Sequence, residues 1–139
     1  MRFEGRFERP PSLKVYKNRN FCGSRVPNES LLVAPARGIQ NAVITIPGAH
    51  HEAADIEARN IVLDNKNCAF NPHVQVAPVG STILLLNSDP ILRDVHARLG
   101  SETLFNVGLP TWRQVKKRLT RTGIVTIVCG PLERSGELG

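Results

Sequence analysis

The sequence lacks a hydrophobic run long enough to cross a membrane. One of its longest runs, residues 83–86, is made of four apolar residues, whereas a membrane-spanning helix needs about 20. Residues 1–8 alternate charged and aromatic side chains, while a secretory signal places an apolar segment after its basic start. We therefore expect a protein without a membrane span, whose signal peptide was either removed or never present.

Sequence motifs of common enzyme classes are also missing. The chain contains no Gly-x-Ser-x-Gly elbow, no His-Glu-x-x-His zinc motif and no glycine-rich phosphate loop. Cys129 and His96 offer a nucleophile and a base, but a cysteine at the end of a Val-Thr-Ile-Val run is more typical of a core strand. We therefore expect no catalysis, and electron transfer at most.

Aromatic residues are scarce, at 5% of the chain, although the formal net charge of +6 would suit a nucleic-acid partner. Single-strand binders place aromatic side chains among their basic residues so that bases can stack on them. The densest basic cluster has no pair of stacking aromatic residues beside it, so we interpret it as a solvated strand face. A basic nucleic-acid-binding β domain is a second alternative. The cluster consists of Arg113, Lys116, Lys117, Arg118 and Arg121.

Helical periodicity is weak, and short β-branched runs bounded by Gly, Pro, Asn and Asp recur along the 139 residues. This pattern is typical of all-β sandwiches and barrels, and 41% hydrophobic residues suffice for one core. We predict a single domain over 1–139, with N-terminal strands and a loop over 1–59 and the core over 60–139. The predicted strands cover 2–7, 13–16, 30–33, 41–46, 61–63, 70–77, 82–86, 94–98, 115–120 and 123–129.

Proline and glycine mark the predicted turns. Two short segments between apolar runs contain both proline, whose φ is fixed, and glycine, which tolerates positive φ. They are residues 35–38 (PARG) and 78–80 (PVG), and each predicts a hairpin. Residues 47–60 (PGAHHEAADIEARN) fit a short helix and a long surface loop about equally well.

Three blocks in the second half of the chain follow one another in an order that resembles a known family. They are CAFNPHVQV (68–76), LNSDPILRDVHA (86–97) with TLFNVGLP (103–110), and GIVTIVC (123–129). The order resembles the cupredoxins, which are blue-copper electron-transfer proteins of the plastocyanin and amicyanin type. The closest resemblance is to a bacterial group of methylamine-utilisation and plastocyanin-like proteins. It implies a cupredoxin-like Greek-key β-sandwich.

The resemblance also implies a copper site, which this sequence departs from. A type 1 site uses a cysteine thiolate, two imidazoles and a weak axial methionine. Cys129 falls on the thiolate position, but Arg93 and Leu132 stand at the two usual histidine positions and no methionine follows. His96 matches a histidine that normally does not bind the metal. Because a guanidinium stays protonated and cannot bind a cation, we expect copper to be absent.

We therefore expect a cupredoxin-like domain that no longer binds copper in the usual way and acts as a binding or structural module with an unidentified protein or redox partner. The alternative is a working electron-transfer protein in which Cys129 and His96 hold copper with non-standard ligands. His73 is a further candidate ligand for a replaced metal site.

The resemblance carries two further expectations. The chain ends soon after Cys129, so we expect the last strand of the family to be missing, through a natural, truncated or frame-altered end, and a homo-oligomer to cover the open sheet edge. A periplasmic or extracellular location is expected by resemblance, while a cytoplasmic one stays open.

Three cysteines, Cys22, Cys68 and Cys129, permit one disulfide with one free thiol or three reduced thiols. Cys22 and Cys68 both lie in the part of the chain away from the copper-type loop around Cys129. We favour a disulfide between these two, which would suit an oxidising compartment, over two reduced and buried cysteines.

Overall fold

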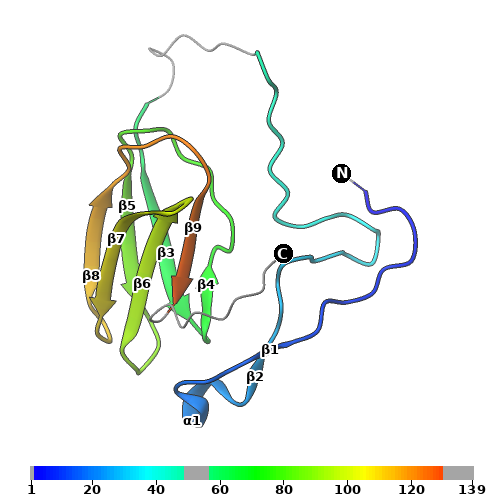
Figure 1. Cartoon of the computed structure of the whole chain (residues 1–139), viewed down its shortest axis with the longest axis horizontal. Helices are drawn as coiled ribbons and strands as arrows, with labels where there is room; N and C mark the ends of the chain where they lie inside the picture. The colour runs from blue at the N-terminus through cyan, green and yellow to red at the C-terminus, as the bar shows by residue number, and fades with distance from the viewer. Residues whose placement is uncertain (1, 49–56, 130–139) are drawn as a thin grey trace.

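The computed structural model describes residues 2–48 and 57–129, which form mainly β-structure. Three sheets are present in this part of the chain, with strand orders β1-β2, β4-β3-β5-β8 and β7-β6-β9 (Figure 1). The elements are β1 (Leu13–Lys14), α1 (Arg19–Cys22), β2 (Arg25–Val26), β3 (Asn60–Lys66), β4 (Ala69–Asn71), β5 (Thr82–Asn87), β6 (Arg93–Leu99), β7 (Glu102–Leu109), β8 (Gln114–Arg118) and β9 (Val125–Cys129).

The two larger sheets pack against each other through one hydrophobic cluster. Side chains alternate between the two faces of a strand, and in β5 this alternation buries Ile83 and Leu85 while Leu84 stays half-buried. Removing such side chains from water contributes about 1.5–3 kcal/mol each to folding. The buried members of the cluster are Leu63, Ile83, Leu85, Val95 and Leu109.

Strand pairing differs from the sequence prediction where the chain enters β5. The predicted strand over 70–77 ends at Asn71, because Pro72 has no N–H to donate to a neighbouring strand. β5 pairs in parallel with β3, from Asn60 opposite Thr82 onwards, and antiparallel with β8. The hairpin predicted at 78–80 is therefore wrong, since the strand before that turn does not form.

The N-terminal segment, blue to cyan in Figure 1, runs outside the two larger sheets. The strands predicted over 2–7, 30–33 and 41–46 are wrong, because this part of the chain has only isolated bridges, between Arg2 and Gly38 and between Val33 and Ile39, besides the short β1-β2 pair. Strand propensity depends on packing against neighbours, and Ile44 is 71% exposed. Of the hairpin predicted at 35–38, the structure has the turn and the isolated antiparallel bridge between Val33 and Ile39, without the flanking strands.

The remaining strand predictions agree with the structure to within a few residues. Strands β3, β5, β6, β8 and β9 cover the predicted segments, whereas β7 and the short helix α1 had no counterpart in the prediction. The strand β7 contains Asn106 and Gly108, which are poor strand formers alone, and it is held as the antiparallel partner of β6. Most of the helix or loop predicted over 47–60 lies outside the described residues. No helix in the described ranges is both long and apolar enough to span a membrane.

Candidate functional site

Arg93 begins strand β6 and belongs to the inner face of its sheet. The alternation of side chains places Arg93, Val95 and Ala97 on the same face, and all three are buried. Only 7% of Arg93 is exposed. A charged group removed from water requires a counter-charge and hydrogen-bond acceptors, so the neighbours of this guanidinium define the site.

Asp89 supplies the counter-charge. The Nε of Arg93 donates to Oδ2 of Asp89 at 3.1 Å, and Nη2 forms a closer contact with the same oxygen. The side chains of Asp89 and Arg93 are 2% and 8% exposed, so the ion pair is withdrawn from solvent. The pair is therefore a buried, charge-assisted contact at one end of the core.

The carboxylate of Asp89 also holds the turn between β3 and β4. Its Oδ1 accepts the N–H of Asn67 at 2.7 Å and its Oδ2 accepts the N–H of Cys68 at 3.0 Å. Both turn residues have positive φ, 55° and 61°, as a two-residue type I′ hairpin loop requires. Asp89 thus joins the start of β6 to a tight turn in the opposing sheet.

Asn87 fixes the two loops that flank this ion pair. Its Nδ2 donates to the carbonyl oxygens of Ile91 and Leu109, both at 2.8 Å, and its Oδ1 accepts the N–H of Asp89 at 3.1 Å. The backbone oxygen of Asn87 accepts the N–H of Trp112 at 3.1 Å. The short polar stretch after β5 is therefore a structural junction in this fold.

The guanidinium of Arg93 also contacts sulfur atoms of two cysteines. Its Nη1 lies 3.9 Å from Sγ of Cys129, and its Nη2 lies 3.4 Å from Sγ of Cys22. Cys22 is joined to Cys68 by a disulfide, as favoured from the sequence, and Cys129 is a free and exposed thiol. One buried cation therefore lies beside a thiol and a disulfide.

His96 and Cys129 are not brought together. Cys129 is opposite Val95 in the β6-β9 ladder, whereas His96 is opposite Val128. Paired residues share a face and consecutive residues lie on opposite faces, so Cys129 shares the inner face with Arg93 while His96 is on the outer face. The two proposed copper ligands are on opposite sides of one sheet.

The other candidate ligands are also dispersed. The ring Nε2 of His96 lies 2.9 Å from the hydroxyl of Thr103 on β7. His73 follows β4, and its Nδ1 lies 3.2 Å from a carboxylate oxygen of Glu29. Leu132 lies outside the described residues. Within the described part of the chain, no group of three or more His, Cys, Asp or Glu side chains is arranged to hold a metal ion.

The described residues around Cys129 do not fit a type 1 copper site. Such a site needs neutral imidazole nitrogens next to the thiolate, whereas among residues 2–48 and 57–129 the guanidinium of Arg93 lies beside the sulfur. A guanidinium has five N–H donors, no acceptor and a permanent charge. This position therefore offers positive charge and donors where copper would need an electron pair.

The basic cluster on and around β8 does not form one uniform face. Along the strand, Lys116 and Arg118 are exposed while Lys117 is half-buried. The ammonium group of Lys117 lies 5.9 Å from the ring centre of Phe105, a cation–π arrangement. Arg121 pairs with Glu102 at 3.0 Å. Alternation along the strand thus separates charges that are adjacent in the sequence.

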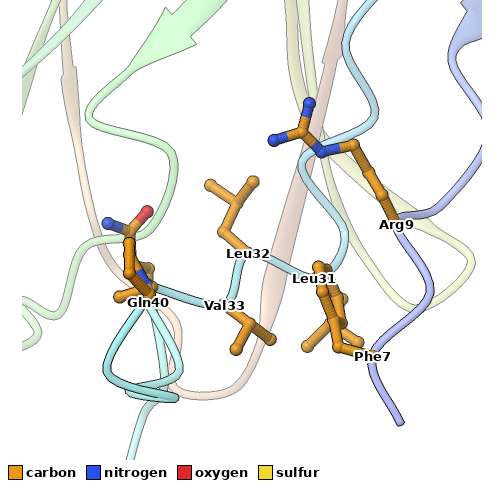
Figure 2. Close-up of a pocket in the computed structure, with 8 residues that line it drawn as sticks. Phe7, Arg9, Leu31, Leu32, Val33 and Gln40 are labelled. Atoms are coloured by element: carbon orange, nitrogen blue, oxygen red, sulfur yellow. The ribbon is translucent and has the colours of Figure 1, made fainter.

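A hollow of about 220 Å³ lies between two stretches of the N-terminal segment (Figure 2). Phe7, Leu31 and Val33 give it an apolar lining, and Arg9 and Gln40 add polar groups. None of the candidate ligands lines this hollow. A second hollow of about 240 Å³ borders the β3-β4 turn at Asn67 and Cys68.

Sequence reasoning missed Asp89, whose carboxylate connects Arg93 to the β3-β4 turn. The sequence shows that Asp89 lies four residues before Arg93 and directly before a proline. Residues four apart are neighbours in a helix, but the same spacing in a loop does not predict a contact. The chain matches no protein-family model, no curated protein and no solved structure.

Proposed function

We propose that this chain is a cupredoxin-like Greek-key β-sandwich in which the ion pair of Arg93 and Asp89 stands in place of a copper site, and that it acts as a structural or binding module. Two packed sheets that share one core support the sandwich part of the proposal. The blocks that resemble cupredoxins lie on β4 to β9, where the core and the ion pair are found.

One observation supports the loss of copper binding above all others, namely the distance of 3.9 Å between Nη1 of Arg93 and Sγ of Cys129. A metal ion bound to this sulfur would have a second cation as its neighbour. Charges of the same sign repel each other strongly where water is partly excluded. The guanidinium cannot relieve this repulsion by losing its proton.

The ion pair supplies a connection that a metal ion provides in other proteins. Asp89 binds the β3-β4 turn through two backbone N–H groups, and Arg93 contacts the disulfide that carries α1. These contacts join three chain segments that are far apart in the sequence. A structural role for this end of the domain follows, with a protein partner still to be identified.

The disulfide between Cys22 and Cys68 supports a periplasmic or extracellular location for the proposed module. Disulfides persist in oxidising compartments and are rare in the cytosol of most organisms. The unpaired thiol of Cys129 is compatible with the same location.

Copper titration tests the proposal. Cu(II) added to the full chain should give no intense visible thiolate-to-copper charge-transfer band. A strong band that disappears in Cys129→Ala would contradict the proposal and favour a working copper protein. His96→Asn serves as the matched control: since His96 is on the other face of the sheet, this variant should behave as the wild type does.

A further inference from the structure

Three cysteines lie around one guanidinium at the end of the core, although they are separated widely in the sequence. Arg93 contacts the sulfur of Cys129 through Nη1 and that of Cys22 through Nη2. The two Nη atoms of a planar guanidinium are about 2.3 Å apart. The thiol sulfur of Cys129 therefore lies within about 10 Å of one sulfur of the Cys22–Cys68 disulfide.

We propose that Cys129 is an exchange-competent third cysteine, which attacks the Cys22–Cys68 disulfide and makes this site an internal thiol–disulfide switch. The thiolate of Cys129 forms a bond to Sγ of Cys22, and the bond between Cys22 and Cys68 breaks. Cys68 leaves as a thiolate and takes up the proton that Cys129 released. The number of disulfides and thiols is unchanged, so the step needs no oxidant or reductant.

Accessibility and charge support this step. Cys129 is exposed at the end of β9, whereas Cys22 and Cys68 are half-buried. During exchange, one negative charge is spread over the attacking, central and leaving sulfurs. The guanidinium touches the attacking and the central sulfur, so its positive charge lies beside the atoms where this charge develops. Arg93 thus acts as a positioning residue for the exchange.

The attacked sulfur is that of Cys22, because Arg93 contacts this cysteine of the disulfide. The N–H of Cys68 is held by Asp89 in the β3-β4 turn. Exchange would release Cys68 as a thiol in that turn and link α1 to the end of β9 instead. The switch therefore moves the anchor of the N-terminal segment from one sheet to the other.

The test maps disulfides in the full chain. Wild-type protein is incubated without reductant at about pH 8, where thiol–disulfide exchange proceeds readily, then quenched with acid and blocked with N-ethylmaleimide. Tryptic digestion separates the three cysteines, because Arg25, Lys66 and Arg93 lie between them. We expect peptides linked through Cys22 and Cys129, together with maleimide on Cys68. Both signals should be lost in Cys129→Ser.

A second variant keeps the test decisive if the native disulfide dominates at equilibrium. In Cys68→Ser, oxidised glutathione should join Cys22 to Cys129 in the folded protein, about tenfold faster than in the same variant unfolded in urea, because the fold holds the two sulfurs near each other. Detection of the Cys22–Cys129 link in wild type, or its faster formation in folded Cys68→Ser, supports the proposal. Absence of the link from wild type, with no acceleration in the folded variant, overturns it.

Discussion

Asp89 and Arg93, four residues apart on either side of a sharp loop, form an ion pair whose side chains are 2% and 8% exposed. The same carboxylate accepts two backbone N–H groups of the β3-β4 turn, and the same guanidinium touches Cys22 and Cys129. One buried pair thus joins the two larger sheets to the disulfide.

Breaking the pair from one side should destabilise the protein strongly. Asp89→Asn leaves a buried guanidinium without its counter-charge, which typically costs about 3–5 kcal/mol of unfolding free energy. Urea denaturation followed by circular dichroism measures the change. Glu102→Gln is the matched control, because its pair with Arg121 is half exposed and such pairs contribute about 0–1 kcal/mol. Equal losses in the two variants would contradict the prediction.

Removing both charges together should cost less than the sum of the single changes. Arg93→Met and Asp89→Asn each leave one partner unsatisfied, while the double variant leaves no unpaired charge in the core. A double-mutant cycle on the urea-derived free energies should give a coupling of about 0.5–3 kcal/mol. Strict additivity would show that the two side chains do not interact.

Asn87→Ala should disrupt the loops at the same end of the core. The variant leaves the carbonyl oxygens of Ile91 and Leu109 and the N–H of Asp89 without their partner. Since an unsatisfied buried polar group costs about 1–3 kcal/mol, we expect a loss of at least about 2 kcal/mol in the same denaturation assay. Asn60→Ala, at the exposed start of β3, should change stability little, and a comparable loss there would speak against this role of Asn87.

Gly123, between β8 and β9, should not tolerate a side chain. Its φ is +132°, and an added Cβ would lie 2.7 Å from Cδ1 of Leu99. Gly123→Ala should therefore lower the free energy of unfolding by about 1–3 kcal/mol, mainly because a residue other than glycine is strained at this φ. Gly38→Ala is the control, because an added Cβ there meets nothing within 4 Å. The prediction fails if the two substitutions have the same effect.

The N-terminal segment should depend on the disulfide more than the core does. Residues 2–48 contain no fully buried side chain, whereas the buried cluster belongs to strands β3 to β7. Reduction with a phosphine should therefore accelerate tryptic cleavage within residues 2–48 while the strands from β3 (Asn60–Lys66) onwards remain protected. Mass spectrometry of the digest would identify the cleavage sites. Uniform cleavage along the chain would contradict the separation of segment and core.

Short apolar and β-branched runs predicted the core strands because such runs are typical of buried strands. Residues 82–86 were predicted as a strand from such a run, and the structure, not the sequence, shows that Ile83 and Leu85 are its buried residues. Residues 41–46 show a similar β-branched pattern, yet Ile44 and Ile46 are 71% and 74% exposed. Propensity alone therefore could not show which segments would find a partner strand.

The candidate site was predictable at Arg93 and less so at its surroundings. The sequence pattern that resembles cupredoxins singled out Arg93, and the pairing of Cys22 with Cys68 was favoured from the sequence as well. The contacts of Asp89 could not be predicted, because they join a loop to a turn more than 20 residues earlier in the chain. The opposite orientation of His96 and Cys129 required the strand register.

A crystal structure grown in the presence of Cu(II) tests the central claim most directly, because it locates the Arg93 side chain and any copper in one experiment. We predict that the guanidinium contacts both Asp89 and the sulfur of Cys129, with no copper bonded to that sulfur. A copper ion bonded to Cys129 and to an imidazole, with the Arg93 side chain turned away from Asp89, would contradict the account.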